Sequence, residues 1–88
     1  MTAIRETLQE RGKTHGDYRH HAEYTQAIKR VCRSSSNWDL MEAHQQETLD
    51  MLAHKIGRVL AGDPNFADHW HDMAGYATLT EQRLDVQL

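Results

Sequence analysis

Residues 47–76 read ETLDMLAHKIGRVLAGDPNFADHWHDMAGY. Apolar residues recur at helical spacing before Gly62 and again after Pro64. Glycine commonly ends a helix, and the dipeptide Asp63-Pro64 favours a tight turn. This segment therefore predicts two antiparallel helices joined by a short connection.

Helical periodicity continues outside this segment and predicts four helices in all, over residues 2–11, 18–33, 39–61 and 66–85. Gly12 is the predicted end of the first helix, while Asp17 and Asn65 are the predicted N-caps of the second and fourth. Asp39 and Glu42 resemble a capping box at the start of the third. Because no strand-like alternation occurs, we predict an all-α fold, an antiparallel bundle of three long helices with a short N-terminal one.

The fourth predicted helix has apolar residues on two sides. Its main predicted core face comprises Phe66, Trp70, Met73, Ala77 and Leu84, and a second stripe comprises Asp68, Asp72, Gly75, Leu79 and Val86. A helix of this kind is expected to touch two neighbours, and the glycine within it suggests a close backbone approach. A single domain of 88 residues has a modest core, so we predict that a homodimer or higher homo-oligomer completes the bundle.

The composition excludes several classes of function. A net charge of −3 argues against a protein that binds nucleic acid through phosphate contacts. No apolar run is long enough for a membrane span, and the N-terminus lacks an apolar signal core. Cys32 is the single cysteine and cannot form an internal disulfide, so we expect a cytoplasmic protein.

Acidic residues recur at helical spacing on the two helices of the central segment, and the four of interest are Glu47, Asp50, Asp68 and Asp72. Carboxylates three or four residues apart point from the same side of a helix. Two such pairs on adjacent helices could hold Mg²⁺ or Mn²⁺, which would bridge phosphates and activate a water oriented by Glu47 or Asp50. Lys55 and Arg58 could neutralise the phosphates. The alternative is that these acids form an ordinary solvated helix face, and Asp68 suits the first turn of its helix.

These residues resemble a known family. The segments QETLD (46–50), KIGR (55–58) and DHWHDMAGYA (68–77), with KTHGDY (13–18), are similar to motifs of the MazG-like all-α nucleoside triphosphate pyrophosphohydrolases. The resemblance is to small phage and bacterial members. It implies a four-helix architecture, oligomers built on dimers, and Mg²⁺-dependent cleavage of a nucleotide to a monophosphate and pyrophosphate.

Two residues depart from the family pattern. Carried over, the metal-binding runs fall on Gln46, Glu47 and Asp50 and on His69 and Asp72, with Asp68 as a substitute. Gln46 carries no charge, and His69 stands where the family has an acid. The resemblance nevertheless implies a Mg²⁺-dependent nucleotide pyrophosphohydrolase-like protein. The alternative is a non-catalytic nucleotide-binding or protein-interaction module on the same scaffold.

Other candidate ligand contacts lie outside the acids. His15 lies on the predicted loop after the first helix and could reach a phosphate or a base, and Trp38 follows a polar loop and could stack on a base. His54 shares a helix side with Glu47 and Arg58, although with other histidines it could instead bind zinc. The predicted substrate-binding residues are Lys55, Arg58, His54, His15 and Trp38.

Overall fold

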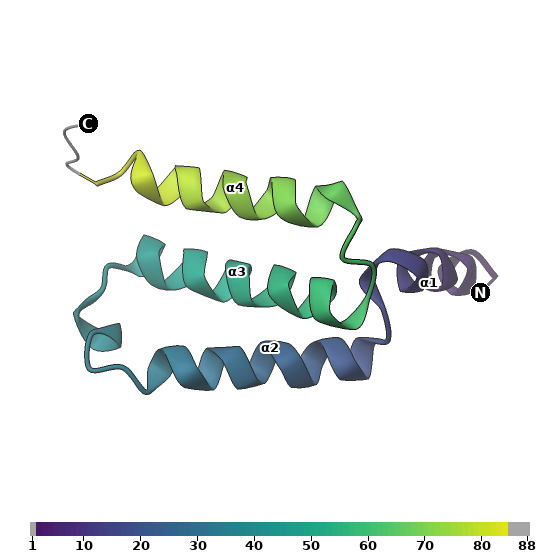
Figure 1. Ribbon diagram of the computed structural model, residues 1–88, viewed down its shortest axis with the longest axis horizontal. Coiled ribbons are helices and arrows are strands. Elements are labelled where there is room, and N and C mark those ends of the chain that lie inside the picture. The colour runs from purple at the N-terminus through teal and green to yellow at the C-terminus, as the bar shows by residue number, and fades with distance from the viewer. Residues whose placement is uncertain (1, 85–88) are drawn as a thin grey trace.

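Four α-helices and one short 3-10 helix form the chain in the computed structural model, which describes residues 2–84 (Figure 1). The helices are α1 (Thr2–His15), α2 (Tyr18–Arg33), η1 (Trp38–Leu40), α3 (Ala43–Ala61) and α4 (Ala67–Glu81). No strand occurs between residues 2 and 84, and the prediction of an all-α fold is confirmed. Over the same residues, every helix is too short or too polar to traverse a bilayer.

Helices α2, α3 and α4 lie side by side with α3 in the middle, and α1 projects from one end of this layer (Figure 1). The contact between α2 and α3 is built from small and polar residues, since His21, Thr25, Ala53 and Gly57 are all buried. A Cβ on Gly57 would collide with Thr25 Oγ1. The absence of a side chain at this glycine is therefore what allows the two helices to approach closely.

The end of α1 differs from the prediction. The helix continues through Gly12, and the chain turns instead at Gly16, whose φ is 80°. A Cβ on Gly12 would meet nothing within 4 Å, so this glycine only lowers helix propensity. Gly16 occupies the left-handed region that favours glycine, and its N–H donates to Gly12 O at 3.0 Å.

Two glycines allow the α1–α2 turn to pack closely against the end of α3. A Cβ on Gly16 would collide with Ala61 O, and a Cβ on Gly62 would collide with Thr14 O. The N–H of Asp63 donates to the same Thr14 carbonyl at 2.9 Å. This junction fixes α1 against the end of the layer.

The N-cap predicted for α2 is confirmed, and those predicted for α3 and α4 are wrong. Asp17 caps α2, because its side chain accepts a hydrogen bond from Arg19 N at 3.1 Å. The predicted capping box at Asp39 is wrong, since that residue lies in η1, and α3 begins after Glu42, whose N–H donates to Gln45 Oε1 at 2.9 Å.

The N-cap of α4 is Phe66, without a side-chain hydrogen bond, so the prediction of an Asn65 cap is wrong. The N–H of Asn65 instead donates to Asp63 Oδ1 at 2.9 Å, which stabilises the turn before the helix. Helix α4 ends at Glu81, and the predicted end at Asp85 lies outside the described residues.

The predicted core face of α4 is also not the face that contacts α3. Trp70 is 54% exposed, and Ala77 is exposed as well. The contacts with α3 come from the neighbouring side, where Asp72 Oδ2 meets Lys55 Nζ at 2.7 Å and Thr80 meets Thr48 through their hydroxyl groups at 2.7 Å. The side predicted to be the core is therefore uncovered in a single chain, and Val86 of the second stripe lies outside the described residues.

Candidate functional site

A cavity of about 550 Å³ lies where α1, the α1–α2 turn, α2 and α3 meet. Its polar and aromatic lining includes Arg11, His15, Tyr18, His21, His54 and Arg58. Three of these, His15, His54 and Arg58, are predicted substrate-binding residues from two different helices. We call this space the arginine–histidine cavity.

Positive charge outnumbers negative charge in the described lining of this cavity. Neither Arg11 nor Arg58 forms an ion pair with another described residue. The pKa of Arg58 is lowered, first by burial and then by the neighbouring Arg11 charge. Asp17, which caps α2, is the one acid among the described residues of the lining, so two arginines face a single carboxylate there. An anion bound here would offset the desolvation of the Arg58 guanidinium group and its repulsion by Arg11.

The surroundings of the cavity histidines lower their pKa values, which favours the neutral imidazole. His21 Nε2 lies 3.3 Å from His54 Nδ1, and the two rings meet edge to face with centroids 4.6 Å apart. Burial, followed by the charge of Arg58, lowers the pKa of His15, of His21 and of His54, the last to about 4. A neutral imidazole can donate one hydrogen bond to a ligand, and a bound anion would favour its protonation.

These histidines make folding stability depend on pH. His54 has an ordinary pKa of 6.5 and a folded-state pKa of about 4, so between these values the unfolded chain binds more protons than the folded chain. We therefore expect the urea midpoint to fall as the pH is lowered from about 7 to about 5. The change His54→Gln should flatten this dependence. An unchanged pH slope in that variant would contradict the assignment.

The four predicted metal ligands are dispersed in a single chain. Arg33 Nη1 and Nη2 donate to the two carboxylate oxygens of Asp50 at 3.1 Å each, and Lys55 pairs with Asp72. Glu47 and Asp68 are exposed. Across residues 2–84, no three His, Cys, Asp or Glu side chains are grouped to hold a metal ion. A metal site built from these four acids therefore remains a prediction. The arrangement of the acids in a single chain does not support it.

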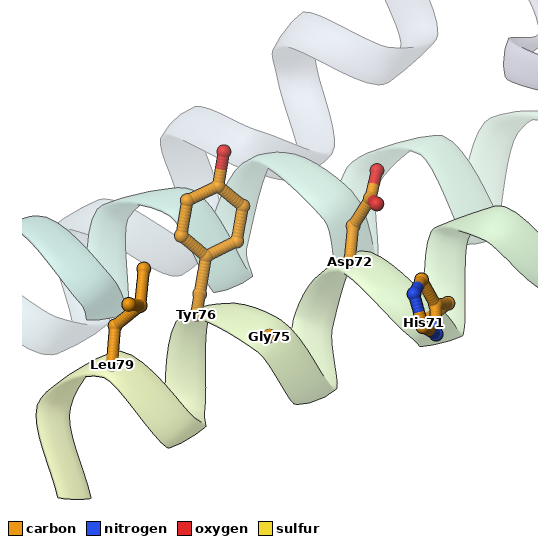
Figure 2. A pocket seen from close by; sticks show the side chains of 5 residues that line it. All are labelled: His71, Asp72, Gly75, Tyr76 and Leu79. Atoms are coloured by element: carbon orange, nitrogen blue, oxygen red, sulfur yellow. The ribbon is translucent and has the colours of Figure 1, made fainter. Parts of the chain in front are cut away.

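A second concave region follows α3 and α4. One hollow, of about 410 Å³, is lined by His71, Asp72, Gly75, Tyr76 and Leu79 (Figure 2). Tyr76 and Leu79 also line an adjoining hollow that contains Glu47. A Cβ on Gly75 would meet nothing within 4 Å, so within one chain no close backbone approach explains this glycine. The two carboxylates nearest this region, those of Glu47 and Asp72, border different hollows.

Two predicted substrate-binding residues lie outside the arginine–histidine cavity. Lys55 is 7% exposed and is held by Asp72, whose pKa is lowered chiefly by the hydrogen bond from this lysine. Trp38 lies under the guanidinium group of Arg33, which is 4.6 Å from the ring centroid. Neither side chain is free to take part in the cavity.

His69, the departure from the family pattern, has a structural position. It is 1% exposed, and its Nε2 lies 2.9 Å from Thr14 O. Its ring packs against His15 and Phe66, with centroids 5.0 Å and 4.9 Å away. This histidine therefore joins α4 to the α1–α2 turn instead of facing the acids.

Sequence reasoning missed Arg11, Tyr18 and His21 as cavity residues. Arg11 and His15 are four residues apart and share one side of a helix only if that helix continues through Gly12. Tyr18 and His21 are three apart on α2, whose bounds were predicted, but their spacing does not show which neighbouring helix they face. Placing a helix end at Gly12 concealed the first pair.

Comparisons with protein-family models, with curated proteins and with solved structures find no match to this chain.

Proposed function

We propose that this chain binds a nucleotide and that the arginine–histidine cavity holds its phosphates. The observation that carries the proposal is the convergence of Arg58, His15 and His54 in one cavity with a second arginine and, among the described residues, a single acid. The volume of about 550 Å³ lies within the usual range of small-ligand pockets, roughly 300–1,000 Å³.

The rim of the cavity supports a ligand larger than phosphate alone. Tyr18 lines the cavity and is 78% exposed, so one face of its ring is available to a planar base. Base stacking on an aromatic side chain contributes about 1–3 kcal/mol and tolerates different bases. A nucleotide would thus place phosphates against the arginines and its base against this ring.

Hydrolysis is the second candidate function. The resemblance to the pyrophosphohydrolases favours it, and Glu47 and Asp72 face neighbouring hollows along α3 and α4. In this reading, Mg²⁺ or Mn²⁺ would be held by Glu47, Asp50, Asp68 and Asp72 only after the ion pairs of Asp50 and Asp72 had opened. Nucleotide binding without cleavage requires no such rearrangement, and we therefore prefer it.

We also propose that the chain functions as a homodimer. Large apolar side chains are unusually exposed in the single chain, and Val31, Leu60 and Trp70 are each more than half exposed at 71%, 55% and 54%. Exposed apolar surface on this scale is typical of protein–protein interfaces.

Calorimetric titration tests the proposal. The purified chain is titrated with inorganic phosphate, AMP and ATP without a divalent cation, and we expect affinity to increase in that order as charge and the base are added. The ATP mixture is then incubated with Mg²⁺ and assayed for AMP and released pyrophosphate. Binding without release supports the preferred function, release supports the second candidate, and the lack of binding by any of the three would remove the nucleotide proposal.

A further inference from the structure

Helix α3 has two chemically distinct sides. At ~100° per residue, Glu47, His54 and Arg58 fall on one side of the helix, and Leu49, Leu52, Ile56 and Leu60 fall on the opposite side. The second side carries no Asp, Glu, Lys or Arg from Gln45 to Leu60. The central helix thus separates a polar side, which contains the cavity, from an apolar side.

The outer helices continue the apolar side. On α2, Tyr24 and Val31 are 45% and 71% exposed and lie between the buried residues and the solvent-facing polar residues. On α4, Trp70, Met73 and Ala77 occupy the corresponding side. We call the surface formed by these apolar side chains of α2, α3 and α4 the apolar layer face.

No described helix covers this face. Helices α2 and α4 pack on either flank of α3, and α1 projects from one end of the layer (Figure 1), where its Arg11 and His15 share the cavity with His54 and Arg58 of α3. Ala53 is accordingly the one apolar residue among those described that is fully buried. A layer of three helices requires a second layer to bury its apolar side.

The chain exposes more surface than a closed monomer of its length does. The accessible surface of the chain is 6671 Å². A folded monomer of this length exposes about 5,300 Å², so the excess is roughly 1,300 Å². The projecting α1 contributes part of that excess, and a standard interface needs only about 800 Å² from each partner. The radius of gyration is 15.2 Å, against about 12 Å for a closed domain of this length.

We infer that the apolar layer face is the surface on which a second copy of this chain docks, layer against layer, with the arginine–histidine cavity of each copy left open on the outside. This inference rests on the proposed homodimer and assigns its interface. A second copy is the occupant because the α3 part of the face, which carries no charge, meets itself across a two-fold axis without like-charge repulsion. A partner that carries charge would be expected to meet complementary charges, which the α3 part of this face lacks.

Sedimentation equilibrium of matched lysine variants tests the interface. Leu60→Lys and Val31→Lys place a charge on the apolar layer face, whereas Leu79→Lys places one on the opposite side of the layer. All three residues lie near helix C-termini and are exposed, at 55%, 71% and 49%, so the charge suits the helix dipole and the fold should be retained. Circular dichroism and ATP titration of each variant check the fold and the cavity.

We expect the unmodified chain to be a dimer. The two face variants should weaken dimerisation by at least about tenfold, because each two-fold interface would bury two unpaired charges. Leu79→Lys should leave dimerisation unchanged. A monomeric unmodified chain would overturn the homodimer itself. A dimer that the face variants do not weaken, or that Leu79→Lys weakens equally, would overturn only the assigned interface. ATP binding reports on the cavity independently of either result.

Discussion

Replacing Arg58 by glutamine is expected to weaken ATP binding by about 10- to 100-fold, because a hydrogen bond to a charged group contributes about 1.5–3 kcal/mol. Arg58 has no ion-pair partner among the described residues, and its charge lies beside that of Arg11. Removing it should therefore leave the folded state at least as stable as before. Calorimetry gives the affinity, and urea unfolding gives the stability.

Arg19→Gln is the matched control for this experiment. Arg19 is an exposed arginine on α2 that pairs with Glu23 and does not line the cavity. We expect its loss to change ATP affinity by less than about twofold, through long-range charge alone. Equal losses in the two variants would mean that ATP responds to overall charge and that Arg58 has no specific contact.

Gly16→Ala is expected to lower the free energy of unfolding by at least about 3 kcal/mol. The left-handed backbone alone costs a non-glycine residue roughly 1–2 kcal/mol. The new Cβ would also collide with the backbone of Ala61, which cannot move aside without breaking the junction that holds α1. Unfolding in urea measures the change.

Gly12→Ala is the control, since it adds the same methyl group four residues earlier. Its Cβ meets nothing within 4 Å and lies inside α1, so we expect a gain of up to about 1 kcal/mol in helix stability. If Gly16→Ala were as stable as Gly12→Ala, the α1–α2 turn could not be packed against Ala61 as described.

Local signals predicted much of the helical structure. Helix α2 has the predicted bounds, because Asp17 caps it and the polar loop after Arg33 ends it. The errors arise where local signals compete with tertiary packing. Gly12 and Gly16 are both residues at which a helix commonly ends. Only the contact between Gly16 and Ala61 shows that the chain turns at Gly16. The start of α3 was displaced for a similar reason, because Trp38–Leu40 forms a separate short turn.

Periodicity identified the apolar stripe of α4 but not what would cover it. The stripe with Trp70 and Met73 is apolar, as predicted, yet the side that meets α3 carries Asp72 and Thr80. Hydrophobic spacing shows that a face will be buried and gives no information on whether the same chain or a second copy buries it. Whether the same chain or a second copy covers the face matters for this protein. Helix α3 contacts both outer helices and still has an apolar side that no described helix covers.

The candidate site was predicted in part. Spacing correctly placed His54 and Arg58 on one side of α3. It could not show that Asp50 and Asp72 would be engaged by Arg33 and Lys55, because ion pairs between helices depend on how the helices pack. Two acids that suggest a metal site in the sequence are thus partners of basic residues in the folded chain.

An NMR titration of the ¹⁵N-labelled chain with ATP, without a divalent cation, tests the central claim most directly. The account predicts that the amide signals of His15, Gly16, His54 and Arg58 shift together along one saturation curve while those of Thr80 and Arg83 do not. Shifts confined to the region of Glu47 and Asp72, or no shifts at saturating ATP, would contradict the assignment of the arginine–histidine cavity as the phosphate site.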